Sequence, residues 1–258
     1  MNKSRPTVKE VCDFLADYSS RLLACGATCI RLEKNVDRIA QTYGKNVDVT
    51  IMPRHISLTV SETDGSESLT VITSIRQAPI SFNINTSLSR LSWVITDRKI
   101  NIGEARKEFG RIITSDSQNS VMVLLLVTLA NASFCRLFGG DAVAMAVVAM
   151  ATLAGYWVKT ILLKHGMDIR VTFAVCSFIS AILGATDGLF DLGSTPELAI
   201  GTSVLYLIPG IPLLNSFSDM LYRHYICSLS RLMDALVLTA CLSTGLCAGM
   251  TLMNVKMF

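Results

Sequence analysis

Residues 120–138 read SVMVLLLVTLANASFCRLF, and residues 142–163 read AVAMAVVAMATLAGYWVKTILL. An α-helix needs about 20 mostly apolar residues to cross the hydrocarbon core of a bilayer. Each stretch has that length, and each contains a single charged residue, Arg136 in the first and Lys159 in the second. The two stretches therefore predict membrane-spanning helices.

Three further stretches of similar composition, at 170–190, 197–217 and 231–253, bring the predicted number of spans to about five. All five contain polar side chains, so we expect the helices to pack against one another more than against lipid. Small residues allow such close helix contacts. They are abundant in the second predicted span: Ala142, Ala144, Ala146, Ala149, Ala151, Ala154 and Gly155.

The charged residues are concentrated in the first half of the chain. Residues 1–117 hold 16 of the 23 Lys and Arg and 13 of the 20 Asp and Glu, although the chain of 258 residues is 51% hydrophobic overall. We therefore predict one domain at 1–117 and a transmembrane domain at 118–258. The start of the chain carries charges throughout and shows no secretory signal, so we expect the first domain to be cytoplasmic.

Residues 1–117 change from helical to strand periodicity and back. Apolar residues at helical spacing predict helices, and strict alternation predicts strands. Asn101 followed by Glu104 is close to a capping box and marks one helix start. The predicted elements are helices at 8–23, 30–43, 86–96 and 102–113 and strands at 47–51, 56–60 and 69–75, with alternation at 80–84 that allows a fourth strand. This domain is thus predicted to be α+β.

Positive residues flank alternate connections between the predicted spans. They lie at the second and fourth connections: Lys159, Lys164, Arg170, Arg223 and Arg231. The third connection carries only acidic residues, namely Asp187, Asp191 and Glu197. By the positive-inside rule, the second and fourth connections are cytoplasmic and the third is outside. The C-terminus is then predicted to be periplasmic, with Asp187 in a loop near the outer face.

The stretch LIPGIPLLNSFSD at 207–219 interrupts the fourth predicted span. Pro209, Gly210 and Pro212 cannot continue a regular helix, because each proline removes a donor and clashes with the preceding turn. At about 1.5 Å per residue, a helix that starts at 197 passes the bilayer midplane near this point. Irregular backbone at that depth persists only in protein or beside a polar cavity, and secondary transporters use such breaks as substrate sites. We expect the break to line a transport path.

Polar side chains follow the break on the next predicted helix. Asn215 and Asp219 are four residues apart and share one face, with Ser218 beside them. A carboxylate at this place can carry a coupling proton or gate the path. The alternative is a kinked helix in which Asp219 caps the helix or pairs with Arg223.

A second polar group lies at the predicted outer end of the first span, in the stretch 130–141. Asn131 is a polar side chain at membrane depth and should face the interior of the bundle. Arg136 can attract an anionic substrate. Alternatively, Arg136 reaches the membrane interface and pairs with Asp141.

Cysteine and histidine form no recognisable metal or cofactor site, so we predict neither a metal nor a cofactor. No C-x-x-C pair occurs, and no cysteine has metal-ligand spacing to a histidine, which favours a packing role for all eight: Cys12, Cys25, Cys29, Cys135, Cys176, Cys227, Cys241 and Cys247. The three histidines, His55, His165 and His224, stand alone and are predicted to be surface or interface residues.

Other function classes have little support in the sequence. No basic cluster with interleaved aromatic residues suggests nucleic acid. Gly44-Lys45 lacks the upstream glycine of a phosphate-binding loop, which argues against ATP hydrolysis. A membrane-embedded hydrolase would need Ser133 to meet His165 or His224, yet these are predicted at opposite membrane faces.

The motifs of the chain resemble the threonine/serine exporter (ThrE) family, most closely the YjjP-type large subunit of its split, two-component branch. The matching motifs are LLACGATCIRLE at 22–33, SFCRLFGGD at 133–141 and PGIPLLNSFSD at 209–219. The order of domain and spans agrees too, so the resemblance covers nearly the whole chain. The motif of 209–219 is the most specific of the three.

The resemblance implies export of small polar metabolites across the bacterial inner membrane, driven by an ion gradient. The full-length branch implies threonine and serine as substrates, whereas the split branch implies succinate and a small membrane partner subunit. The chain ends at Phe258 without a second set of spans, which favours the split branch. The expected function is therefore a non-enzymatic subunit of a dicarboxylate exporter, and assembly of several copies stays open.

Three alternatives remain: export of threonine or serine, a membrane-anchored sensor whose first domain binds a ligand, and an intramembrane enzyme. For the sensor, the charged residues Arg31, Glu33 and Asp37 are candidates, although a solvated helix face explains them as well.

Overall fold

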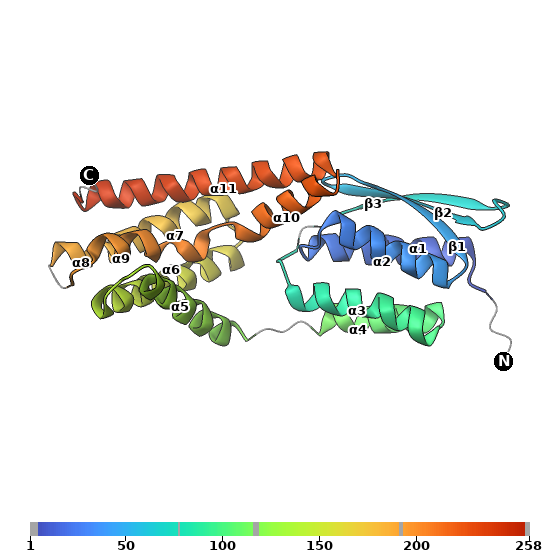
Figure 1. Cartoon of the computed structure of the whole chain (residues 1–258), viewed down its shortest axis with the longest axis horizontal. Helices are drawn as coiled ribbons and strands as arrows, with labels where there is room; N and C mark the ends of the chain where they lie inside the picture. The colour runs from blue at the N-terminus through green and yellow to red at the C-terminus, as the bar shows by residue number, and fades with distance from the viewer. Residues whose placement is uncertain (1–4, 77, 116–118, 191–192, 256–258) are drawn as a thin grey trace. The chain divides into compact units, whose positions relative to one another are not determined.

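The computed structural model describes residues 5–76, 78–115, 119–190 and 193–255 (Figure 1). The chain forms two compact units that do not follow chain order. The first unit comprises Met1–Ser117 and Ile211–Met233, and the second comprises Gln118–Gly210 and Asp234–Phe258. The predicted boundary at 117/118 and Asp191 lie outside the described residues.

An antiparallel sheet of three strands in the order β1-β2-β3 lies in the first unit. The strands are β1 (Lys45–Ile51), β2 (His55–Glu62) and β3 (Ser68–Ser74). Alternate side chains of the central strand point into the core, because successive residues of a strand face opposite sides. Ile56, Leu58 and Val60 are accordingly fully buried.

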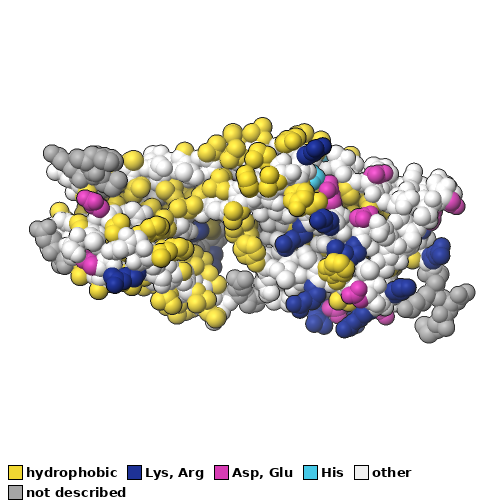
Figure 2. Space-filling model, viewed as in Figure 1, with side chains coloured by type: hydrophobic (Ala, Val, Ile, Leu, Met, Phe, Trp, Pro, Cys, Tyr) yellow, Lys and Arg dark blue, Asp and Glu magenta, His cyan; other side chains and the backbone are white. Residues whose placement is uncertain are grey.

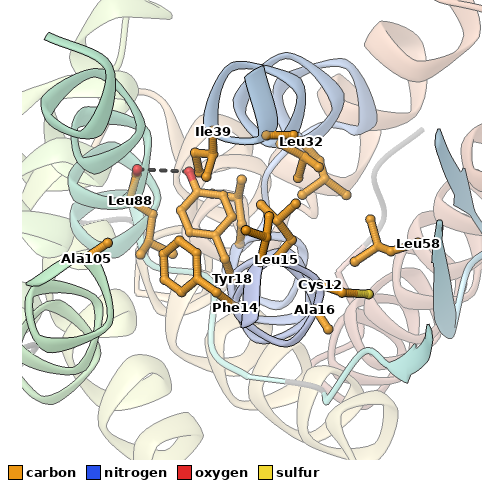
Figure 3. Close-up of a cluster of buried hydrophobic side chains, with 14 of the residues drawn as sticks. Cys12, Phe14, Leu15, Ala16, Tyr18, Leu32, Ile39, Leu58, Leu88 and Ala105 are labelled. Carbon is orange, nitrogen blue, oxygen red and sulfur yellow. Dashed lines mark hydrogen bonds between the residues drawn. The ribbon is translucent and has the colours of Figure 1, made fainter. Parts of the chain in front are cut away.

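Helices complete the core of the first unit. They are α1 (Val8–Ala24), α2 (Cys29–Thr42), α3 (Phe82–Arg98) and α4 (Ile102–Thr114). Of these, α1 and α2 lie on the sheet, and α3 and α4 pack against these two helices. Figure 3 shows Phe14, Leu15 and Tyr18 of α1 at the centre of the core, with Leu32 and Ile39 of α2 and Leu58 of β2 around them. The buried hydroxyl of Tyr18 donates to the carbonyl of Leu88, 2.9 Å away. The predicted helices and the first three strands are confirmed, and so is the capping box of Asn101 and Glu104.

The fourth strand allowed at 80–84 is wrong. Phe82 begins α3, and the Ser81 side chain caps this helix by accepting from the backbone N–H of Ile84. The alternation covered only three apolar residues, and local capping outweighs so short a pattern.

Two further helices join the first unit from the far end of the sequence. They are α10 (Gly210–Leu221) and the first part of α11 (Tyr225–Leu252). The Ser216 hydroxyl donates to the carbonyl of Ser228, and the Ser228 hydroxyl donates to the carbonyl of Ser216, both over 2.8 Å. These reciprocal bonds hold the end of α10 against the start of α11. α11 begins at Tyr225, six residues before the predicted start of the last span at 231.

The second unit consists of helices: α5 (Ser120–Leu137), α6 (Ala142–Lys164), α7 (Ile169–Gly184), α8 (Thr186–Leu189), α9 (Pro196–Ser203), the 3₁₀ helix η1 (Leu205–Leu207) and the rest of α11. Within the described ranges, four segments are long and apolar enough to cross a membrane: α5, α6, Ile169–Leu189 and α11. A fifth span exists only if Pro196–Leu207 and Gly210–Leu221 are counted together as one broken span. The chain is therefore built as a multipass membrane protein.

The surfaces of the two units differ in character (Figure 2). In this view, side chains of both charges gather over the first unit and hydrophobic side chains over the second. Large apolar side chains are exposed along α5 in particular: Val121, Met122, Leu125, Leu126 and Leu129. Water-soluble proteins rarely expose apolar patches of this extent, whereas a lipid-facing surface requires them.

Glycines allow close helix contacts inside the second unit. A Cβ atom on Gly245 of α11 would collide with the carbonyl of Ala174 and the hydroxyl of Ser177 on α7. A Cβ atom on Gly155 of α6 would collide with the hydroxyl of Tyr206. The expected use of small residues at helix contacts is thus present.

Candidate functional site

The predicted interruption of the helix is present at Pro209. α9 ends at Ser203, η1 ends at Leu207, and Ile208 has an extended backbone with ψ of 126° before α10 begins. The N–H of Ile208 donates to the carbonyl of Leu205 over 3.1 Å, which is a 3₁₀ bond and not an α-helical one. Pro209 has no N–H to donate to the carbonyl of Leu205, so the helical hydrogen bonds are interrupted there, and α10 begins at the next residue, Gly210.

Tyr206 places a polar group beside the interruption. Its phenol oxygen lies 3.0 Å from the hydroxyl of Ser180 on α7, and its ring packs near Tyr156 with centroids 6.2 Å apart. Tyr206 is not among the residues predicted from the sequence. The available signal was its place three residues before Pro209, within the part of the span predicted at the bilayer midplane.

Asn131 faces the interior of the second unit, as expected. It is only 3% exposed and donates to the Thr152 hydroxyl over 2.6 Å and to the carbonyl of Thr202 over 3.1 Å. One amide thereby joins α5, α6 and α9. The second unit buries further hydroxyl groups, on Thr172, Ser177, Ser180 and Ser203, so its interior is unusually polar for a membrane bundle.

Arg136 and Asp141 do not form the ion pair considered from the sequence, among the residues that the structure describes. Arg136 is exposed and donates to the carbonyl of Gly140 over 3.1 Å. Asp141 caps α6 by accepting from the N–H of Ala144 over 2.7 Å, and it also accepts from the N–H of Ser194 over 2.6 Å. The bond from Ala144, followed by that from Ser194, lowers the pKa of Asp141 below its usual range.

Asp187 is a buried carboxylate that the sequence analysis expected in a loop. The structure places it in α8 with no exposed surface, and neither of its oxygens has a hydrogen-bond partner among the described residues. A Cβ atom on Gly193 would lie 2.9 Å from an oxygen of Asp187 and 2.8 Å from an oxygen of Asp141. The two carboxylates therefore approach the same backbone segment. A buried carboxylate without a cation beside it favours uptake of a proton or a cation, because its isolated charge is costly to bury.

Asp219 is the centre of a polar cluster in the first unit. It has no exposed surface and accepts from the backbone N–H of Cys29 over 2.9 Å, at the positive end of α2. Its second oxygen lies 3.0 Å from the guanidinium of Arg231 and 3.4 Å from the thiol of Cys29. The pKa of the Cys29 thiol is raised, first by a hydrogen bond with Cys227 and then by burial, so the thiol stays protonated and can donate to Asp219.

Asn215 and Arg231 extend this cluster to the turn between α1 and α2. The Asn215 amide donates to the carbonyl of Gly26, and the Arg231 guanidinium donates to the carbonyl of Ala27, both over 2.9 Å. Asn215 and Asp219 thus share one helix face, as predicted. The stretches 22–33 and 209–219, quoted above as separate motifs, are in direct contact through these bonds.

The partner of Asp219 is Arg231 and not Arg223, the alternative considered from the sequence. Nothing in local spacing marks Arg231, because it lies on the next helix. His224 is not an isolated surface residue either: its Nε2 atom lies 3.4 Å from a carboxylate oxygen of Glu33.

The remaining candidate residue of α10, Ser218, lines a groove of 570 Å³ in the first unit. Of the predicted site residues, Pro212, Asn215, Ser218 and Asp219 belong to the first unit, whereas Asn131, Arg136, Asp141, Pro209 and Gly210 belong to the second. No group of three potential metal ligands occurs among His, Cys, Asp and Glu of the described chain.

Comparisons with known proteins agree on one family. The family described as "Putative threonine/serine exporter" (ThrE) matches residues 13–253. The chain is similar to a "Probable succinate transporter subunit YjjP" of Klebsiella aerogenes, with 27% identity over 237 residues that cover 91% of each chain. It is also similar to a protein of the same description from Escherichia coli (strain K12), with 28% identity over 136 residues that cover 52% of this chain and 53% of that protein. No solved structure matches.

Proposed function

The chain belongs to the threonine/serine exporter family, and from this premise we propose that it is one subunit of a secondary-active exporter of small polar metabolites. The proposed substrate is a dicarboxylate such as succinate, and the proposed partner is a separate small membrane subunit. Two relatives described as succinate transporter subunits support both points. The proposed location is the bacterial inner membrane.

The observation that carries this proposal is the helix interruption at Pro209 between apolar segments. Membrane-depth backbone that leaves the α-helical pattern needs polar surroundings. The second unit supplies them with the hydroxyls of Tyr206 and Ser180 and the amide of Asn131. In the proposed mechanism, the polar substrate passes this interruption, which gives it hydrogen-bond partners inside the bilayer.

Coupling to an ion gradient is proposed to involve Asp187. A carboxylate that is buried without partners favours a proton or cation in place of water. Its neighbour Asp141 is held ionised by its hydrogen bonds, so a cation or proton near Asp187 is also attracted by a second negative charge. Uptake and release of this ion would accompany substrate movement.

The cluster around Asp219 is proposed to hold α10, which follows the interruption, to the first unit. Asn215, Asp219 and Arg231 together contact the turn between α1 and α2. A movement of that turn would therefore be transmitted to α10. This assigns Asp219 a positioning role in gating and leaves proton uptake to Asp187.

The proposed topology has the N-terminus in the cytoplasm and the C-terminus in the periplasm. Lysines and arginines lie at the second and fourth connections and are absent from the third, which agrees with this orientation by the positive-inside rule. Alkaline phosphatase fused to a periplasmic C-terminus is expected to be active. A cytoplasm-dependent fluorescent protein fused at the same place is expected to show no fluorescence. The reverse pattern would contradict the orientation.

A threonine or serine exporter is the alternative within the family, and a membrane-anchored ligand sensor is the alternative of another class. Efflux experiments separate them. Cells that express this chain together with its co-encoded small membrane protein should release succinate faster than cells that express either alone. If only threonine is released faster, the substrate is threonine and not succinate. If no efflux rate changes, the result favours the sensor.

A further inference from the structure

The groove beside Ser218 is lined by one face of α2, one face of α3 and the end of α10. Its volume is 570 Å³, within the range of about 300–1,000 Å³ that is typical of small-molecule sites. Its polar lining consists of cations, hydroxyls and one amide: Thr28, Arg31, Lys34, Asn35, Arg38, Thr86, Ser89, Ser218 and Tyr222. Ile30 and Trp93 complete it. No carboxylate belongs to this lining.

The three cations of the groove lack acidic partners. Arg31, Lys34 and Arg38 form no ion pair with any residue that the structure describes. The nearest acidic residues in sequence are engaged elsewhere, because Glu33 contacts His224 and Asp37 accepts from Gln41. A groove with three uncompensated positive charges attracts anions.

Neutral hydrogen bonds hold the two arginines in place. Arg31 donates to the Asn85 side chain over 2.8 Å, and Arg38 donates to the Asn35 side chain over 3.0 Å. The Arg38 guanidinium also stacks on the ring of Trp93, with 3.7 Å between its central carbon and the ring centroid. Each guanidinium has five N–H donors, so both keep donors for a ligand. Such pre-ordering lowers the entropic cost of binding.

The spacing of the cations indicates the class of anion. Arg31, Lys34 and Arg38 follow one another by three and four residues on one face of α2. The Cα atoms of neighbouring members of this set are therefore about 4.5–6 Å apart along the helix axis. Two carboxylates of a short dicarboxylate can each meet one cation at this spacing, and arginine binds a carboxylate through two parallel N–H bonds.

We propose that this groove of the first unit is a binding site for a short dicarboxylate anion. The site is separate from the interruption at Pro209; its charges favour an anion, and the choice of succinate among dicarboxylates rests on the proposed function. Tyr222 lies beside Lys34, with 5.9 Å between the ammonium and the ring centroid, and Ser218 precedes it on α10. A ligand in the groove would thus contact α10 as well as α2 and α3, so binding can report the substrate concentration to the helix that follows the interruption.

Isothermal titration of the purified full chain with succinate tests this site. Saturable binding is expected, with at least a tenfold loss of affinity in Arg31→Gln and in Lys34→Gln. Lys34 makes no hydrogen bond among the described residues, so its substitution should leave the fold intact. Arg90→Gln removes a charge from α3 outside the groove and should bind as the unmodified chain does. Neutral succinamide should not bind.

The outcomes distinguish this site from the proposed function. Unchanged affinity in both variants, equal binding of succinamide, or tighter binding of inorganic phosphate or of anionic lipid vesicles than of succinate would overturn the proposal. If succinate does not bind to a chain that still supports succinate efflux, only the proposed binding site in the groove is overturned. Binding in a chain that supports no efflux with its partner would instead overturn the proposed export.

Discussion

Two aspartates that look alike in the sequence have opposite surroundings in the structure. Asp219 and Asp187 are both fully buried, but Asp219 accepts from Cys29 and pairs with Arg231, whereas Asp187 has no cation partner in the described chain and lies beside the backbone of Gly193. A compensated carboxylate can stay ionised and hold elements together. An uncompensated one changes its charge by taking up a proton or cation, which is the property that ion coupling needs.

Loss of Arg231 should destabilise the first unit strongly. Arg231→Gln leaves the Asp219 carboxylate buried without its cation. We expect the free energy of unfolding to fall by about 3 kcal/mol. This is the low end of the range for a broken buried ion pair, because Arg231 is partly exposed and solvent screens its charge. Thermal unfolding in detergent measures this. Arg223→Gln is the control, since Arg223 is exposed and forms no ion pair among the described residues.

The double variant Asp219→Asn/Arg231→Gln checks the cause of that loss. It should be more stable than Arg231→Gln alone, because it removes the uncompensated charge. A double variant that is less stable than either single variant would argue against a buried ion pair.

Asp187→Asn should abolish ion-coupled efflux while the protein still reaches the membrane. Asparagine keeps the size of the side chain but cannot exchange a proton, so we expect at least a tenfold lower succinate efflux rate in the presence of an imposed pH gradient. Asp234→Asn is a matched control, because Asp234 is exposed. Efflux of Asp187→Asn at the rate of the unmodified chain would remove Asp187 from the coupling mechanism.

At the scale of elements, most of the fold was predictable from periodicity. The spans of α5 and α6 and the strands β1 to β3 match their predicted ranges closely, because each shows a sustained apolar pattern. The start of α3 was not predictable in this way, since three alternating residues imitate a strand and the capping bond of Ser81 decides the outcome. Long apolar patterns therefore predicted the elements correctly, whereas the short pattern at 80–84 was overridden by a local hydrogen bond.

Two glycines should respond differently to substitution by alanine. The Cβ atom added by Gly201→Ala on α9 meets no atom within 4 Å, and alanine has the higher helix propensity. We therefore expect the free energy of unfolding to stay the same or to rise by up to about 1 kcal/mol. Gly155→Ala on α6 collides with the Tyr206 hydroxyl beside the interruption and should destabilise by about 1–3 kcal/mol. Unfolding in detergent measures both changes. Equal stability of the two variants would mean that Tyr206 does not pack against Gly155.

At the scale of the whole molecule, the sequence predicted its division into a charged part and an apolar part but not the grouping of Ile211–Met233 with the first unit. That grouping depends on contacts between side chains and backbone groups 189 and 190 positions apart, such as Asn215 with the carbonyl of Gly26 and Asp219 with the N–H of Cys29. Hydropathy and periodicity describe neighbours along the chain and carry no information on such contacts. For the same reason Arg231 was missed as the partner of Asp219, while the inward orientation of Asn131 followed from burial cost alone.

The central claim is that the interruption at Pro209 lines a polar path for substrate. Ile208 has a half-exposed side chain there, so Ile208→Cys can be treated with a membrane-impermeant thiol reagent in cells that also express the small partner subunit. We predict that the reagent blocks succinate efflux and that excess succinate slows the reaction. The unmodified chain and Leu126→Cys, on the exposed apolar face of α5, should keep their efflux. A cysteine at 208 that does not react, or that reacts without any effect on efflux, would contradict the claim.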